Sequence, residues 1–190
     1  MAKEFNVAIA GATGAVGVEM LKTLENRNFP VKNIKLLASA RSAGKTMQFK
    51  GETLTIEEMT PASFKGVDIA LFSAGGSVSK EYRKFVTDAG AVMVDNSSAF
   101  RMEEDVPLVV PEVNPEDIAK HNGVIANPNC TTAIMLVAVA PLHRAKKLRR
   151  LVASTYQAAS GAGAKGMAEL IEQTRQILNG EPILLISLFK

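Results

Sequence analysis

Short apolar segments recur along the first two thirds of the chain, each bounded by glycine, proline, asparagine or charged residues. Such segments are typical of strands buried on both faces of a parallel sheet. They lie at residues 5–10, 34–39, 67–73, 91–95 and 123–126. Apolar residues at helical spacing follow the first segment (Val16, Met20, Leu24) and the third (Val78, Tyr82, Phe85, Val86). The alternation of strand and helix predicts an α/β fold with a doubly wound, mostly parallel sheet.

The rest of the chain departs from this alternation. Residues 46–56 alternate loosely around Gly51 and predict an added hairpin rather than a crossover helix. A long apolar helix is expected over residues 131–143, followed by a strand over residues 148–157. An amphipathic helix comes next, using Met167, Leu170, Ile171, Thr174, Ile177 and Leu178. The strand and the amphipathic helix indicate that a new domain opens near residues 130–150.

The sequence ends on an apolar run, EPILLISLFK, at residues 181–190. No later element of the chain can cover this run, and an exposed apolar tail is an aggregation hazard. One interpretation is that the run packs on its own domain. We favour the other, that the sequence which naturally covers it is missing here.

Composition and charge narrow the class of protein. With 190 residues, 47% of them hydrophobic, the chain can bury the core of one full domain and part of another. The net charge is +3, and the basic run at residues 144–150 is interpreted as a solvated helix end, so no nucleic-acid partner is expected. One cysteine excludes an internal disulfide, and no segment suits a signal peptide or a membrane span. We therefore expect a cytoplasmic protein without a membrane partner.

A glycine-rich turn, GATGAVG, follows the first predicted strand and opens directly into a predicted helix. Glycines at this spacing permit a tight turn, a close approach to a pyrophosphate and close helix packing, and the helix N-terminus adds N–H donors. A glycine turn without a ligand is the alternative. The strand and helix around the turn favour a dinucleotide site, which comprises Gly11, Ala12, Thr13, Gly14, Ala15, Val16 and Gly17.

The end of the second predicted strand indicates which dinucleotide binds. NAD sites usually have Asp or Glu at this point, because a carboxylate accepts a hydrogen bond from the ribose hydroxyl. This chain instead has Ser39, Arg41 and Ser42, and an arginine can hold a 2′-phosphate through paired hydrogen bonds. We therefore predict NADP as the cofactor.

The single cysteine stands in the motif NPNCTTA, between a short predicted strand and the long apolar helix. Asn129 is a natural helix cap, and Cys130 falls in the first turn, where the helix dipole and N–H groups lower the pKa of a thiol and can bind an oxyanion. Free cysteines are usually inert core residues, but this polar turn is unlike a core position. Cys130 is therefore predicted to be a nucleophile.

With these motifs in place, the sequence closely resembles aspartate-semialdehyde dehydrogenases of the bacterial type over about residues 4–180. The resemblance is carried by GATGAVG, FSAGG, VDNSSAFRM, VPEVN, NPNCTT and TYQAASGAG, which occur in the family's order. It implies a Rossmann-type NADP-binding domain at residues 1–129, followed by the start of an α/β catalytic and dimerisation domain at residues 130–190.

The activity implied by the resemblance is the NADP-dependent interconversion of aspartyl-4-phosphate and aspartate-4-semialdehyde, a step toward lysine, threonine and methionine. Cys130 would form a thioester with release of phosphate. Asn129 and Arg101 would hold the phosphate, and Gln157 would orient the substrate. Further residues would lie along the cofactor: Ala74, Gly75, Gly76, Ser160, Gly161 and Gly163. A homodimer is expected once the second domain is complete.

One part of the family's machinery has no counterpart in this sequence. The catalytic histidine and the substrate-binding arginine of the family lie further along a longer chain, and His121 and His143 lack the family's motif. We assign neither histidine a catalytic role. The thiol is then without a proton shuttle, which typically contributes about 10²–10⁴ in rate. We expect slow or absent turnover from a chain that ends before the catalytic apparatus is complete.

Two alternatives stay open. Enzymes that act on glyceraldehyde 3-phosphate or acetylglutamyl phosphate also place a cysteine at a helix start, although NPNCTT and TYQAASGAG fit them less well. A non-catalytic NADP-binding module would account for the missing histidine, but not for Cys130 and Gln157.

Overall fold

A computed structural model describes residues 3–183 of the chain. These residues fall into two compact units, the first ending at Leu151 and the second beginning at Val152. The predicted domain boundary at residue 129 remains a prediction. Most of the apolar run at the end of the sequence, residues 184–190, lies outside the described residues. Whether another segment covers this run therefore stays a prediction.

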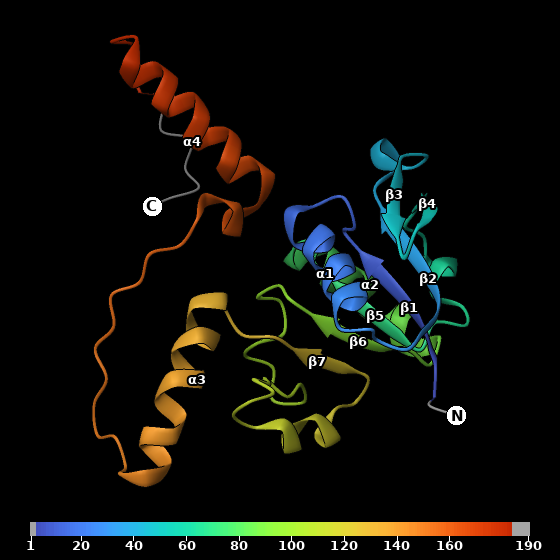
Figure 1. The fold of residues 1–190 in the computed structure, drawn as a ribbon, viewed down its shortest axis with the longest axis horizontal. Coiled ribbons are helices and arrows are strands. Elements are labelled where there is room, and N and C mark those ends of the chain that lie inside the picture. Colours follow the sequence, from blue (N-terminus) through green and yellow to red (C-terminus); the bar gives the residue numbers. More distant parts are fainter. Residues whose placement is uncertain (1–2, 184–190) are drawn as a thin grey trace. The chain divides into compact units, whose positions relative to one another are not determined.

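A seven-stranded sheet forms the centre of the first unit (Figure 1). Its strands are β1 (Phe5–Ala10), β2 (Val31–Ala38), β3 (Thr46–Phe49), β4 (Glu52–Glu58), β5 (Ile69–Phe72), β6 (Val92–Asp95) and β7 (Val124–Ala126). The strand order is β3-β4-β2-β1-β5-β6-β7, and every neighbouring pair is parallel except the β3–β4 hairpin. Because the order runs outward from β1 in both directions, the doubly wound sheet and the added hairpin are confirmed.

The α-helices lie close to the positions that apolar spacing predicts. They are α1 (Ala15–Asn26), α2 (Gly76–Asp88), α3 (Cys130–Ala145) and α4 (Gly163–Leu178). Short 3₁₀ helices are η1 (Ala40–Ser42), η2 (Pro61–Phe64), η3 (Pro115–Lys120) and η4 (Ala159–Ala162). Within residues 3–183, none of the helices combines the length and apolar character that crossing a membrane requires.

The predicted strand at residues 148–157 is wrong. This segment has no regular structure and pairs with no strand among the described residues. An apolar, β-prone stretch becomes a strand only where a neighbouring strand satisfies its backbone groups.

Alternate side chains of β1 face two different helices. Ile9 packs in one core with Leu21 of α1. Ala8 and Ala10 pack in another core with Val86 of α2. Because successive side chains of a strand point to opposite faces, α1 and α2 cover opposite sides of the sheet. Burial on both sides explains why β5 is apolar throughout and why Val7–Ala10 of β1 are apolar and buried.

The parallel strands end together at one edge of the sheet. Gly11 follows β1, Ser39 follows β2, Ser73 follows β5, Asn96 follows β6 and Asn127 follows β7. In open α/β sheets, ligands bind at this carboxyl edge. The edge therefore brings together residues from most of the predicted motifs of the first unit.

Candidate functional site

The glycine-rich turn that joins β1 to α1 is built on close backbone contacts. Gly11 has a φ of +86°, and a Cβ added there would lie 2.4 Å from the carbonyl oxygen of Ser73. A Cβ at Gly17 would lie 2.2 Å from the carbonyl oxygen of Gly11. Both positions require glycine, the first for its conformation and space and the second for space alone. The turn therefore holds the start of α1 against the ends of β1 and β5.

The start of α1 presents backbone donors that the helix itself does not use. Its N-cap, Gly14, makes no side-chain cap, and the N–H of Val18 is bonded to the Gly14 carbonyl at 3.0 Å. The N–H groups of Ala15, Val16 and Gly17 precede this bond, so they have no acceptor within the helix. Donors of this kind, together with the helix dipole, fit the pyrophosphate of a dinucleotide.

Ala12 has a packing role in this turn. Its side chain is fully buried against the α1 core. Its N–H donates to the Leu37 carbonyl at 3.1 Å, as the N–H of Gly11 does at 2.9 Å. A cofactor can therefore use only the carbonyl of Ala12, whereas the side chain of Thr13 is exposed.

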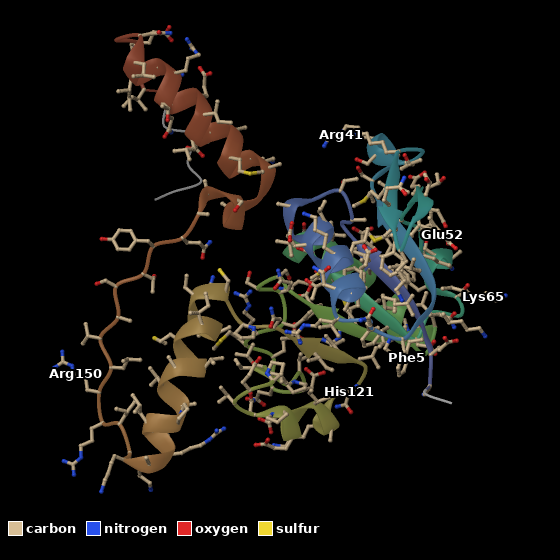
Figure 2. The ribbon with its side chains drawn as sticks, in the orientation of Figure 1. Phe5, Arg41, Glu52, Lys65, His121 and Arg150 are labelled. Atoms are coloured by element: carbon tan, nitrogen blue, oxygen red, sulfur yellow. The ribbon has the colours of Figure 1, made fainter. Side chains whose placement is uncertain are left out.

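The segment after β2 presents a cation beside the predicted ribose position. Ser39 and Arg41 are exposed, and Figure 2 shows Arg41 on the connection between β2 and β3. Within residues 3–183, no acidic side chain forms an ion pair with Arg41. Ser42 is only 7% exposed, which leaves Ser39 and Arg41 as the better placed ligands for a phosphate.

The second predicted cofactor loop joins β5 to α2. Gly75 caps α2 with a φ of +95°, a conformation that other residues adopt at a cost, and no side chain caps this helix start. Ala74 and Gly76 flank it and are half-buried. The helix starts of α1 and α2 thus both offer backbone donors at the carboxyl edge, which fits a dinucleotide that extends across the edge.

Cys130 is the first residue of α3, as predicted, and it is exposed. The helix start is fixed by Asn129, whose side-chain oxygen accepts hydrogen bonds from the N–H of Thr131 at 3.1 Å and of Thr132 at 3.4 Å. The same oxygen accepts from the Thr131 hydroxyl at 2.5 Å. The cap employs the oxygen of Asn129, so any bond from this side chain to an anion must come from its amide nitrogen.

Arg101 is held beside the chain segment that leads into Cys130. Its Nε donates to the Asn127 carbonyl at 2.9 Å, and its Nη2 donates to the Asn96 carbonyl at 3.1 Å. Both acceptors are neutral, and in the described part of the chain no carboxylate pairs with this half-buried guanidinium. A fixed cation without an anionic partner is suited to binding a phosphate.

The remaining predicted residues lie in the second unit. Gln157 precedes η4, Ser160 and Gly161 lie within it, and Gly163 begins α4 with a φ of +79°. A Cβ at Gly161 would lie 2.1 Å from Nε2 of Gln157. Gly161 therefore makes room for the Gln157 side chain, a role that the sequence did not indicate.

The two histidines bond to the backbone rather than to the site residues. Nδ1 of His121 accepts from the N–H of Gly123 at 3.0 Å, and Nδ1 of His143 accepts from the N–H of Leu148 at 3.3 Å. A ring nitrogen that already accepts a hydrogen bond is poorly placed to take a proton from a thiol.

Several polar residues at the carboxyl edge were not predicted from the sequence. Asn96 and Asn127 hold Arg101, and Asp95 lies fully buried at the end of β6. The sequence pattern that could have indicated them is a polar residue directly after a buried strand. Asn96 follows the strand VMVD in this way, and Asn127 follows the strand VIA.

Comparison with known proteins identifies the family. The profile described as "Semialdehyde dehydrogenase, NAD binding domain" matches residues 6–121, and the profile described as "Semialdehyde dehydrogenase, dimerisation domain" matches residues 139–184. The chain belongs to the semialdehyde dehydrogenase family. The resemblance seen in the motifs and the Rossmann-type fold are thereby confirmed.

Members of the semialdehyde dehydrogenase family match almost the whole chain. The aspartate-semialdehyde dehydrogenase of Synechocystis sp. is 58% identical over 95% of this chain and 54% of its own length. The crystal structure of aspartate semialdehyde dehydrogenase II from Vibrio cholerae, complexed with ASA, has a TM-score of 0.91 and 48% identity, covering 100% of this chain and 56% of that one. The chain spans about half the length of these relatives.

A third relative of the family is known with its cofactor. The crystal structure of aspartate semialdehyde dehydrogenase with NADP from Candida albicans has a TM-score of 0.63 and 30% identity, covering 76% of this chain and 48% of that one. Together with the NAD-binding profile, this relative supports a nicotinamide cofactor for the present chain.

Proposed function

We propose that this chain supplies the cofactor site and the nucleophile of a phosphorylating aspartate-semialdehyde dehydrogenase. The observation that carries the proposal is that Arg101 is anchored to the chain segment that leads into Cys130. The thiol begins α3, and the guanidinium is held by the carbonyl of Asn127, three residues before it. A nucleophile and a cation for phosphate are what the breakdown of an acyl phosphate requires.

In the reductive direction, the sulfur of Cys130 attacks the carbonyl carbon of aspartyl-4-phosphate. A carbon–sulfur bond forms, the carbon–oxygen bond to phosphate breaks, and inorganic phosphate leaves with the electron pair. The thiol proton passes to solvent. Arg101 offsets the charge that grows on the leaving phosphate, and the dipole of α3, which begins at Cys130, favours negative charge at the reacting carbonyl. When bound, NADPH supplies the hydride that reduces the thioester to the aldehyde.

NADP is the proposed cofactor. Arg41 and Ser39 follow β2, where an NAD site would carry a carboxylate. The exposure of Arg41, and the absence of an acidic ion-pair partner for it within residues 3–183, leave its guanidinium available for a 2′-phosphate. The Candida albicans relative, described with NADP, supports the same choice.

The complete enzyme is proposed to act in amino-acid biosynthesis, on the route to lysine, threonine and methionine. Gln157 orients the substrate, and the match to the dimerisation profile supports a homodimer. The small-molecule partners are aspartate semialdehyde or aspartyl phosphate and inorganic phosphate.

Trapping of the thioester tests the proposal. The chain is incubated with aspartyl-4-phosphate, and its intact mass is measured before and after digestion to locate the adduct. We expect one acyl group on Cys130 and none in Cys130→Ser. NADPH affinity, measured by fluorescence, should change by less than about twofold in this variant, because the thiol and the cofactor phosphates use different helix starts.

Competing acyl phosphates separate the alternatives. Acetylglutamyl phosphate and 1,3-bisphosphoglycerate are offered under the same conditions. Faster acylation by either one would reject aspartyl phosphate as the substrate. NADPH binding without any acylation would favour the non-catalytic module, and failure to bind NADPH would reject both.

A further inference from the structure

Asp95 is a fully buried carboxylate at the end of β6, and the chemistry above does not use it. Among the described residues, no cation pairs with it. Two hydroxyls donate to it instead, Ser79 to one oxygen at 2.5 Å and Ser97 to the other at 2.6 Å. The two carboxylate oxygens are therefore both hydrogen-bonded, one from α2 and one from the loop after β6. A buried polar group is costly unless it is hydrogen-bonded, so the two hydroxyls are what make this buried position tolerable.

The bond from Ser97 shapes the loop that carries Arg101. The Ser97 hydroxyl donates to Asp95 and accepts from the N–H of Ala99 at 3.0 Å, so the carboxylate fixes a turn just before Arg101. The preceding residue, Asn96, supplies the carbonyl that accepts from Nη2 of Arg101. Its side-chain oxygen also accepts from the amide of Asn127 at 2.7 Å. The path of residues 96–101 thus decides where the guanidinium lies.

The bond from Ser79 ties the same carboxylate to α2. Ser79 is fully buried in the first turns of this helix. A Cβ added at Gly76 would lie 3.8 Å from the Ser97 hydroxyl, so the helix start lies against the loop. Further along, Arg83 of α2 bonds to Glu103 and lies with its guanidinium carbon 5.3 Å from the centre of the Phe100 ring. The loop is therefore held at both ends, with Asp95 acting at its start.

We propose that Asp95, through Ser97, is a positioning residue that holds the loop of residues 96–101 so that Arg101 presents its guanidinium to phosphate. The inference rests on the phosphate role of Arg101 in the proposed function. Ser79 bonds the other oxygen of the same carboxylate, from α2, whereas Ser97 belongs to the loop itself.

Titration of the purified 190-residue chain with inorganic phosphate tests this role. The rise in melting temperature with phosphate gives its dissociation constant, and chloride at matched ionic strength serves as the reference. Ser97→Ala should raise the phosphate Kd about tenfold, equivalent to a loss of about 1.4 kcal/mol. Asp95→Asn should also raise it, because an amide offers one oxygen acceptor in place of two. Ser97→Thr retains the hydroxyl and should restore the Kd to within about twofold.

Ser79→Ala is the matched control. It removes a hydroxyl from the same buried carboxylate, so it should lower the melting temperature about as much as Ser97→Ala does. Its phosphate Kd should nevertheless stay within about twofold of the wild-type value. NADPH affinity, measured in parallel, should stay within about twofold in Ser97→Ala.

Arg101→Ala separates the positioning role from the proposed function. Loss of phosphate binding in Arg101→Ala, with normal binding in Ser97→Ala, would overturn the role of Asp95 and leave the phosphate site standing. Equal weakening in Ser79→Ala and Ser97→Ala would overturn it too, because general destabilisation would then suffice. Wild-type phosphate affinity in Arg101→Ala, or no binding to the wild-type chain, would reject the phosphate site and the positioning role together.

Discussion

Glycines with positive φ differ in what surrounds them, and the difference separates a conformational cost from a steric one. Gly11 and Gly66 have similar φ values, +86° and +74°. A Cβ at Gly11 meets backbone atoms of Ser73, whereas a Cβ at Gly66 has nothing within 4 Å. Only Gly11 combines an unusual conformation with a close approach of two strand ends.

Replacement of each glycine by alanine measures the two costs. Gly66→Ala should destabilise the chain by about 1 kcal/mol, because only the left-handed conformation is penalised. Gly11→Ala should cost at least about 2 kcal/mol more, since the backbone of Ser73 must move, and it should weaken NADPH binding. Urea unfolding and NADPH fluorescence provide the measurements. Equal losses of stability in the two variants would contradict the role of Gly11.

Arg41 is the residue on which the choice of cofactor depends. Arg41→Ala should raise the Kd for NADPH by about ten- to a hundredfold and leave the Kd for NADH within about twofold, because only NADPH carries the 2′-phosphate. Lys45→Ala removes another exposed cation from the same connection and should affect both cofactors only slightly. The four constants can be measured by fluorescence titration. Equal weakening of NADPH and NADH in Arg41→Ala would argue against specific recognition of the phosphate.

At the scale of elements, apolar segments were sufficient to predict the central strands and helices. Strands buried on both faces are apolar throughout, and amphipathic helices reveal their spacing, so both patterns survive in the sequence. The segment at residues 148–157 failed because strand formation depends on a partner strand, which local sequence does not contain. The environment of Asp95 could not be predicted for a similar reason, since its donor Ser79 lies sixteen residues earlier, on another element.

The start of α3 combines a structural cap with a predicted phosphate ligand in one side chain, Asn129. Asn129→Ala removes the oxygen that accepts from Thr131 and Thr132, and it should cost about 1 kcal/mol of stability. Asn129→Asp keeps an acceptor at this position and places a negative charge at a helix start, so stability should be retained or slightly increased.

Phosphate binding distinguishes the two roles of Asn129. The aspartate variant lacks the amide donor and repels the anion, so its phosphate Kd should rise at least about tenfold despite its normal stability. Thermal unfolding with and without phosphate measures both quantities. Unchanged phosphate affinity in Asn129→Asp would restrict Asn129 to capping.

At the scale of the whole molecule, helices α3 and α4 expose several large apolar side chains to solvent. In α3, Ile134 is 73% exposed and Leu142 is 62% exposed, and in α4 Ile171 is 71% exposed. The sequence showed that these helices are apolar or amphipathic, but apolar content alone does not show whether a surface is buried. The core that contains Val86 of α2 joins residues from Ala8 to Ala126, so its members come from elements far apart in the sequence.

The rate at which this chain can turn over a substrate depends on whether it contains a general base. Cys130 lies at a helix start, and backbone carbonyls hold Arg101 in place. The only histidines in the sequence are His121 and His143, and the Nδ1 atom of each accepts a hydrogen bond from a backbone N–H group. With aspartyl-4-phosphate, we therefore expect a burst of at most about one inorganic phosphate per chain, followed by release slowed by about 10²–10⁴ relative to an enzyme with a general base. A phosphate-release assay, corrected for spontaneous hydrolysis, would show the burst, and Cys130→Ser should lack it. Sustained release at the burst rate would mean that another group of this chain serves as the base.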